Sequence, residues 1–217
     1  MKILAISDIH SEDEVLDKLK SAVVSHEYEC LVIAGDITHN GPVSFAHDLI
    51  YDLELIGMKT YAVVGNMDPP EVLAKLEGAD SSIHLKKVSI GGGWSLAGFG
   101  GSLAGGAHTP TEFTEEEIYK GLSSLAIDSK TILVTHAPPQ GVETFDITDK
   151  GVAIGSKSIR RIVEEKKPAV LVCGHVHETQ GIARLGETII VKLGPAYEGK
   201  AAVLELNGKI KATLIEI

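Results

Sequence analysis

The sequence is poor in the features that mark secreted and membrane proteins. Its 217 residues include two cysteines, Cys30 and Cys173, and neither has a CxxC partner. Both lie in or beside apolar runs, so we expect buried free thiols rather than a disulfide or a redox centre. No apolar run reaches the roughly 18 residues needed to cross a bilayer, and the apolar part of MKILAISDIH is too short for a signal peptide. We therefore expect a soluble, cytoplasmic protein, without a membrane partner, that folds as one domain over residues 1–217.

Positive charge is also scarce, with 20 Lys and Arg residues against 30 Asp and Glu residues and a net charge of −10. A protein that binds nucleic acid usually carries a basic face. The most basic stretch, KSIRRIVEEKK at 157–167, includes two glutamates, and its spacing fits the solvated side of a helix. No GxGxxG or GxxxxGKS/T motif occurs in a suitable context. The sequence therefore indicates neither a nucleic-acid surface nor a dinucleotide or P-loop site.

Hydrophobic residues nevertheless make up 44% of the chain, enough for a sizeable core. Short runs rich in Val, Ile and Leu do not alternate with polar residues, which is typical of strands covered on both faces. These predicted strands are 2–7, 30–34, 60–64, 131–135 and 169–173. The predicted helices between them are 12–26, 44–56, 70–76, 115–125 and 156–165. Thr114 with Glu117 predicts a capping box, and Pro168 predicts a helix end.

The remaining segments read as short strands and hairpins. Three short strands are expected at 82–85, 87–90 and 95–99. Two hairpins are expected, 179–185 with 187–193 around Gly186, and 201–206 with 209–215 around Asn207-Gly208. The Asn-Gly pair is a strong hairpin signal, so the tail is expected to be antiparallel. Parallel β-α units combined with these hairpins indicate two packed sheets with helices outside.

The segment GGGWSLAGFGGSLAGGAH at 91–108 is dense in glycine, but Trp94, Leu96 and Phe99 interrupt it. A loop near a ligand and a strand with flexible ends both fit this composition. We favour the strand, and we expect Trp94 to belong to the core rather than to line a pocket.

Each of the five predicted buried strands is followed by side chains that can coordinate a metal. These residues are Asp8, His10, Asp36, Asn66, His136, His175 and His177. Ligands of open α/β sheets bind outside the carboxyl ends of the strands, so parallel neighbouring strands would bring all seven to one rim. Alone, a strand-end Asp or Asn commonly caps a helix or turn, and a single His is commonly structural. Together, buried carboxylates and imidazoles are costly, and a metal pair is the simplest compensation.

The donor set also indicates which metals fit. Oxygen and nitrogen donors without a thiolate disfavour a structural zinc site and suit Mn²⁺, which we favour, with Fe, Zn²⁺, Ni²⁺ or Co²⁺ as alternatives. Seven donors exceed what one tetrahedral ion takes, but they suit two divalent ions that share a carboxylate. Two ions about 3.5–4 Å apart can hold a hydroxide and polarise a phosphoryl oxygen. Glycines at 35, 65 and 174 precede three of the donors and let the backbone turn sharply there.

Five sequence blocks carry a family resemblance. They are DxH at 8–10, GD at 35–36, GN at 65–66, the lone His136 and GHxH at 174–177. In order and spacing this series resembles the calcineurin-like metallophosphoesterases, and at this length it resembles their compact prokaryotic phosphodiesterases. The resemblance implies an α/β (α+β) fold, a four-layer sandwich of two mixed β-sheets flanked by helices.

The resemblance also implies a division of the donors between two metals. Asp8, His10 and His177 would hold the first ion, and Asn66, His136 and His175 would hold the second. Asp36 would bridge the two ions together with a hydroxide. That hydroxide would attack phosphorus in line, giving direct hydrolysis without a phospho-enzyme.

Met67 departs from the family pattern, which usually has a His there to protonate the leaving oxygen, followed by an acidic residue that orients this His. Methionine has no titratable proton, and Asp68 is left without an imidazole to orient. General acid catalysis contributes typically 10²–10⁴ in rate. The favoured reading is therefore a phosphodiesterase for esters with good leaving groups.

Two alternatives to the phosphodiesterase stay open. One is a phosphomonoesterase or nucleotide phosphatase in which another group replaces the missing acid, with His39 as the best candidate and His108 as the next. A surface loop position is the competing reading of both histidines. The other is a metal-binding scaffold without catalysis, against which the intact set of seven donors argues.

The remaining expectations concern single residues and partners. Asn40 is a candidate to contact a phosphate oxygen or to form a turn, and Asn66 is also a candidate substrate contact. His26, His47 and His84 match no block and are expected to be surface or structural residues. The expected partner is a small phosphoester substrate, and the apolar tail hairpin permits a homodimer.

Overall fold

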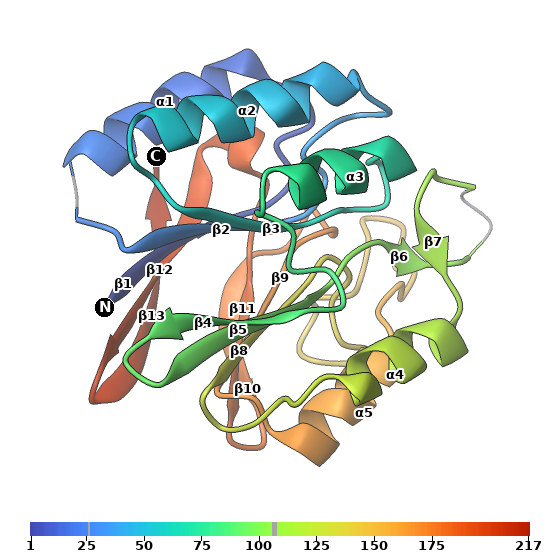
Figure 1. The fold of residues 1–217 in the computed structure, drawn as a ribbon. Helices are drawn as coiled ribbons and strands as arrows, with labels where there is room; N and C mark the ends of the chain where they lie inside the picture. Colours follow the sequence, from blue (N-terminus) through green and yellow to red (C-terminus); the bar gives the residue numbers. More distant parts are fainter. Residues whose placement is uncertain (26, 106–107) are drawn as a thin grey trace.

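The computed structural model of the chain describes residues 1–25, 27–105 and 108–217. His26 lies outside the described residues. Two large mixed sheets pack face to face, and helices cover both outer faces, which gives the four layers visible in Figure 1. The fold expected above is thus the fold observed.

The first large sheet has five strands and lies under three helices. In spatial order its strands are β13 (Lys209–Glu216), β12 (Lys200–Asn207), β1 (Lys2–Ile6), β2 (Cys30–Ala34) and β3 (Thr60–Val63). The covering helices are α1 (Asp13–Ser25), α2 (Val43–Leu55) and α3 (Pro70–Gly78). Strands β1, β2 and β3 are parallel, because each is joined to the next through a helix, whereas the β12–β13 hairpin adds antiparallel.

The second large sheet has six strands and lies against two helices. In spatial order its strands are β10 (Gly181–Leu185), β11 (Thr188–Lys192), β9 (Val170–Cys173), β8 (Thr131–Thr135), β5 (Trp94–Phe99) and β4 (Lys87–Gly91). The covering helices are α4 (Glu115–Ser124) and α5 (Lys157–Lys166). Two short strands, β6 (Ser102–Leu103) and β7 (Glu112–Phe113), pair separately, and a 3₁₀ turn, η1 (Ala196–Glu198), precedes β12.

The apolar side chains form three layers of core. One lies between the two sheets and includes Trp94, Cys30 and residues of β1, β8 and β9. The other two lie between each sheet and its helices. Both cysteines are buried free thiols, as expected. None of the helices within 1–25, 27–105 and 108–217 is long and apolar enough to cross a membrane.

The predicted capping box and hairpins are confirmed. The Thr114 side chain accepts from the backbone of Glu117, whose carboxylate accepts from the backbone of Thr114. The Asn207-Gly208 turn joins β12 to β13, with Gly208 at φ 76°. All five predicted buried strands exist to within one residue at each end.

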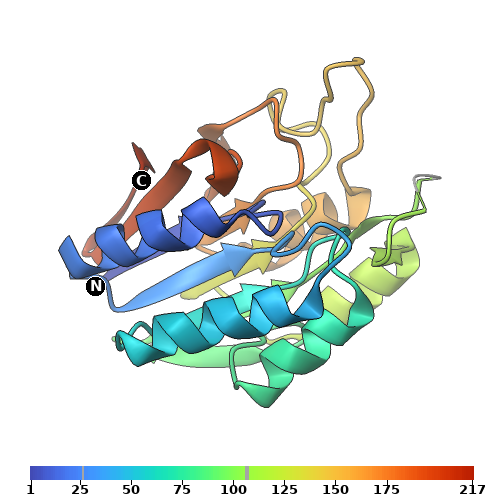
Figure 2. The same ribbon diagram turned by 90° about the horizontal axis from the view of Figure 1, so that it is seen from above.

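Two expectations about the strands were wrong. The segment 82–85 is not a strand, because it passes between the sheets and makes only isolated bridges, Ser82 to Ala62 and His84 to Gly98. The tail is not purely antiparallel, since β11 runs parallel to β9. The five strands that precede the candidate donors do not all belong to one sheet. They are divided between the two sheets, which meet at the same edge (Figure 2).

The glycine-dense segment contains β5, as favoured, and its glycines allow close packing rather than flexibility. A Cβ at Gly98 would lie 2.6 Å from the Val63 side chain, and one at Gly100 would lie 2.4 Å from the Val64 carbonyl oxygen. Strand β5 therefore comes directly against the end of β3. Thr111, further along the chain, supports the turn after β3, because its N–H donates to the Asn66 carbonyl oxygen at 3.1 Å.

Candidate metal centre

The seven donor residues gather where the carboxyl ends of strands from both sheets meet. Asp8 and His10 follow β1, Asp36 follows β2, and Asn66 follows β3, all in the first sheet. His136 follows β8, and His175 and His177 follow β9, in the second sheet. Two groups of donor atoms each lie within 4.8 Å of one another. They are Asp8, His10, Asp36 and His177, and Asp36, His136 and His175, so that Asp36 belongs to both.

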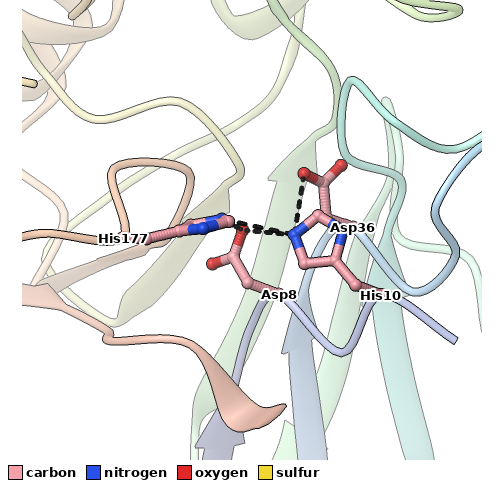
Figure 3. Close-up of side chains that lie close together, drawn as sticks. All are labelled: Asp8, His10, Asp36 and His177. Atoms are coloured by element: carbon pink, nitrogen blue, oxygen red, sulfur yellow. Dashed lines mark hydrogen bonds and ion pairs between the residues drawn. The ribbon is translucent and has the colours of Figure 1, made fainter. Parts of the chain in front are cut away.

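In the first group the ring nitrogens and carboxylates point toward one another (Figure 3). The Nε2 atoms of His10 and His177 lie 3.2 Å apart. His177 Nε2 also lies 3.2 Å from Asp8 Oδ1, and His10 Nε2 lies 3.7 Å from Asp36 Oδ2. Two imidazole nitrogens and two carboxylates that face one point are the donors a divalent cation needs.

The second group is more deeply buried. His136 Nε2 lies 3.3 Å from Asp36 Oδ2 and 3.0 Å from the side-chain oxygen of Asn66. The other ring nitrogen of His136 lies 2.8 Å from the Ala34 carbonyl oxygen, to which it donates. This contact holds the hydrogen on Nδ1 when Nε2 acts as a ligand, as outer hydrogen bonds do at metal sites.

Four of the donors have a backbone conformation that is rare for residues other than glycine. The φ angles are 59° at Asp8, 54° at His10, 49° at Asp36 and 75° at His175. Such conformations cost free energy and persist where the surrounding structure enforces them, often at functional sites. Here they turn the chain sharply at the ends of three strands, which aims the side chains back over the sheet edge.

The glycines before the donors are required by close packing. A Cβ at Gly174 would lie 1.9 Å from Ser7 Oγ and 2.6 Å from Asp8 Oδ2. A Cβ at Gly65 would lie 2.0 Å from Asp36 Oδ1. These glycines thus let one strand end pass directly over the donors of another.

The charges of the site shift the pKa values of its histidines in opposite directions. Burial lowers the pKa of His136, but the Asp36 and Asp8 carboxylates outweigh burial and raise it to about 9. Burial and the neighbouring His136 lower the pKa of His175 to about 3. For Asp8 burial opposes ionisation, yet the hydrogen bond from His177 and the charge of His136 lower its pKa below the usual range. In the metal-free protein the carboxylates are thus paired with imidazoles, and a bound metal ion can supply the compensating positive charge instead.

Asp68 has a bracing role that the sequence did not reveal. Its carboxylate is fully buried. It accepts hydrogen bonds from Gly65 N at 2.8 Å, Ile37 N at 3.1 Å, Thr38 N at 2.7 Å and Thr38 Oγ1 at 2.9 Å. Burial and the Asp36 charge raise the pKa of Asp68 to about 6 despite these donors. The carboxylate therefore ties the turn after β2 to the turn after β3.

Met67 contributes its backbone rather than its side chain to this region. Its N–H donates to Asp36 Oδ1 at 2.8 Å, and its carbonyl accepts from Asn40 N at 2.9 Å. Asp36 is thereby held by position 67 whatever side chain stands there.

Lys192 was also missed, because a lysine in a β-strand carries no signal of burial. It is fully buried on β11. Its ammonium donates to the carbonyl oxygens of Val176 at 2.7 Å, Thr179 at 3.1 Å and Leu193 at 2.6 Å. All three of its hydrogens are thus used, and two of them hold the loop that carries His175 and His177.

The structure distinguishes among the other candidate residues. His39 is exposed, but its Nδ1 lies 3.3 Å from His10 Nδ1, so it borders the site. Asn40 is exposed in a turn at φ 59°, and His108 is exposed at φ 54° next to residues outside the described part.

His47 and His84, which match no sequence block, are surface or structural residues, as expected. His47 is a surface residue paired with Asp48, and His84 is structural, since its Nδ1 accepts from Gly100 N at 2.9 Å.

Comparison with known proteins assigns the family. A model of the calcineurin-like phosphoesterases matches residues 1–179. The chain therefore belongs to the calcineurin-like phosphoesterases, and it is a metal-dependent phosphoesterase. Over 218 residues it is 37% identical to the uncharacterized protein MJ1162 of Methanocaldococcus jannaschii, a match that covers 95% of this chain and 96% of that one.

Solved structures of low sequence identity share the fold. TT1561 of Thermus thermophilus superposes with a TM-score of 0.80 at 19% identity, covering 99% of this chain and 98% of that one. A dimetal phosphatase from Danio rerio gives 0.68 at 14%, covering 100% and 98%. A protein described as a novel archaeal phosphodiesterase gives 0.59 at 13%, covering 100% of both chains. At these identities the likeness concerns the fold alone.

The donor set of this chain fits a pair of divalent ions. It offers three carboxylate or amide oxygen donors and four imidazoles, with no thiolate, in two groups joined by Asp36. Two buried aspartates placed so close together need compensating positive charge.

Proposed function

We propose that this protein hydrolyses phosphodiesters of small molecules at a centre of two divalent ions, with Mn²⁺ as the favoured metal. The observation that carries the proposal is that Asp36 belongs to both groups of donor atoms. Asp8, His10 and His177 would hold one ion, Asn66, His136 and His175 the other, and Asp36 both. Ions bound there would supply the Lewis acidity that activates water and neutralises charge on the phosphoryl group.

The chain's own residues would position the reaction. Asp68 and the backbone of Met67 keep Asp36 in place, and Lys192 keeps the loop of His175 and His177 in place. The side chain at position 67 cannot protonate a leaving oxygen, and Asp68 is engaged by four backbone and hydroxyl donors. This arrangement favours esters whose leaving groups need no proton, and the fold likeness to an archaeal phosphodiesterase is consistent with diesters.

The proposal is tested by a matched assay with added Mn²⁺. Hydrolysis of bis-p-nitrophenyl phosphate is compared with that of p-nitrophenyl phosphate, before and after chelation. We expect the diester to be preferred and both activities to disappear with chelator. If the protein takes up metal and hydrolyses only the monoester, the diesterase proposal is wrong. If it binds metal and hydrolyses neither compound, the result favours a metal-binding scaffold without catalysis.

Position 67 provides a second test. We expect Met67→His to raise the hydrolysis of diesters with alkoxide leaving groups, by up to about 10², and to change p-nitrophenyl esters little. The gain is limited because the Asp68 carboxylate is already occupied. Met67→Gln, which is similar in size and cannot act as an acid at pH 7, is the control. A loss of bound metal in Met67→His but not in Met67→Gln would contradict this expectation.

A second candidate function is a phosphomonoesterase in which His39 replaces the missing acid. The contact of His39 with His10 at 3.3 Å supports it. In that case His39→Gln abolishes monoester turnover, whereas His47→Gln, which changes an exposed histidine on α2, does not. Equal monoester rates in both variants would remove this candidate.

A further inference from the structure

Tyr197 lies at the candidate metal centre although no block of the sequence points to it. It belongs to η1, beyond the residues 1–179 that match the family model. Two backbone hydrogen bonds attach this turn to the end of β1, from Ala196 N to the Ser7 carbonyl at 2.8 Å and from Tyr197 N to the Asp8 carbonyl at 3.4 Å. The turn is therefore held against the strand that carries Asp8.

The phenol oxygen of Tyr197 contacts a proposed metal ligand from its outer side. Tyr197 Oη lies 3.1 Å from His177 Nδ1. The other nitrogen of that ring, Nε2, faces Asp8 and His10 at 3.2 Å each. When His177 coordinates through Nε2, its ring hydrogen must be on Nδ1, so Nδ1–H donates and Tyr197 Oη accepts.

This assignment leaves the hydroxyl hydrogen of Tyr197 for another partner. Among the described residues, His177 is the hydrogen-bond partner of Tyr197 Oη. The ring borders a cavity of about 480 Å³ whose other walls are His10, Glu12, His39 and His177. Its centroid lies 5.7 Å from that of His10 and 5.6 Å from that of His177. The hydroxyl is thus beside the donors and next to space that a substrate can enter.

We propose that Tyr197 is a substrate-binding residue that donates its hydroxyl hydrogen to an oxygen of the substrate's phosphate group. This inference rests on the proposed function and deepens it. The imidazole of His177 orients the phenol, and the phenol supplies one neutral hydrogen-bond donor beside His10 and His177. The chain lacks a protonated imidazole at position 67, and Tyr197 adds a fixed donor at the same rim.

The test measures phosphate binding and metal binding separately in Tyr197→Phe, which removes only the hydroxyl. The matched control is Tyr51→Phe, on the exposed face of α2. Inorganic phosphate is titrated into each Mn²⁺-loaded protein by calorimetry, and Mn²⁺ into each metal-free protein. We expect phosphate Kd to rise about tenfold or more in Tyr197→Phe, as for a lost hydrogen bond to a charged group. We expect Mn²⁺ stoichiometry to stay at the wild-type value, and KM for the diester to rise with phosphate Kd.

Two results would overturn the inference. Equal phosphate Kd in wild type, Tyr197→Phe and Tyr51→Phe means that the hydroxyl does not contact phosphate. A fall in Mn²⁺ affinity that accounts for the whole loss of phosphate binding means that Tyr197 only orients His177. A wild-type protein that binds Mn²⁺ and phosphate but hydrolyses neither ester would refute the proposed function while leaving this comparison valid.

Discussion

Individual side chains around the centre have roles that their position in the sequence does not suggest. Asp68 stands where the family pattern places the residue that orients a catalytic imidazole. In this chain its carboxylate instead binds the backbone of two turns, at Gly65 and at Ile37 and Thr38. The residue is thus a structural brace of Asp36 and Asn66, independent of what occupies position 67.

Asp68→Ala is expected to destabilise the protein strongly. It leaves three buried N–H groups without acceptors, and each unpaired group costs about 1–3 kcal/mol. The free energy of unfolding in urea is expected to fall by about 3 kcal/mol or more, with a loss of bound metal. Asp48→Ala, at an exposed carboxylate, is the control and should change it by less than about 0.5 kcal/mol. Equal stability of the two variants would contradict the bracing role.

Strand β9 and the loop after it are held in place from two sides. The loop carries His175 and His177, passes within contact of Ser7 and Asp8 at Gly174, and is held from the far side by Lys192. The parallel pairing of β11 with β9 places Lys192 directly beside Cys173. The buried ammonium is satisfied there, because it donates to the Val176 and Thr179 carbonyl oxygens of the loop.

Gly174→Ala is expected to displace this loop. The added methyl would lie 1.9 Å from Ser7 Oγ and 2.6 Å from Asp8 Oδ2, so these side chains or the loop must shift. We expect bound Mn²⁺, measured by atomic absorption after gel filtration, to fall below half of the wild-type amount. Gly78→Ala is the matched control, because nothing lies within 4 Å of a Cβ at the end of α3. That control should bind metal normally, and a normal metal content in Gly174→Ala would show that the loop can adapt.

For the molecule as a whole, the site exists because two sheets end at the same edge. The first sheet supplies Asp8, His10, Asp36 and Asn66, and the second supplies His136, His175 and His177. Metal binding would therefore join the two halves of the sandwich. Ions that bind only the folded chain stabilise it by mass action, so removal of metal should lower the melting temperature.

Metal uptake is expected to depend on pH in a defined direction. In the metal-free protein the pKa of His136 is raised to about 9, chiefly by Asp36, so at pH 7 this histidine is protonated and its proton competes with the metal. The pKa of His175 is about 3, so that ring is already neutral and releases no proton. Mn²⁺ affinity should thus rise with pH between 6 and 9, by up to about tenfold per unit from His136.

Proton release measures this effect directly. Calorimetric titration of Mn²⁺ at pH 7 in buffers of different ionisation enthalpy should report the His136 proton leaving on binding. The same titration at pH 9.5 should show this contribution largely gone. Affinity that falls as pH rises from 6 to 8 would contradict the assignment.

Local pattern was sufficient to predict the buried strands, the helices, the capping box and the order of the seven donor residues. Continuous apolar runs and strand-end polar residues are local features, because they reflect burial and turning of the chain within a few residues. The division of the strands between two sheets was not predictable from such runs, since every fully buried strand looks alike. The mistaken strand at 82–85 has the same cause, because its apolar pattern reflects burial between sheets rather than pairing.

Tertiary structure alone decided which residues support the centre. The supporting contacts join residues distant in the chain, and they are made by Asp68, Lys192 and Tyr197. No spacing in the sequence predicts a buried lysine or a phenol beside an imidazole. The sequence determined the donors and their chemistry, because side-chain type dictates what can bind a divalent ion. Their geometry, their protonation and their supporting hydrogen bonds were decided by folding, because burial and neighbouring charge depend on which strand ends meet.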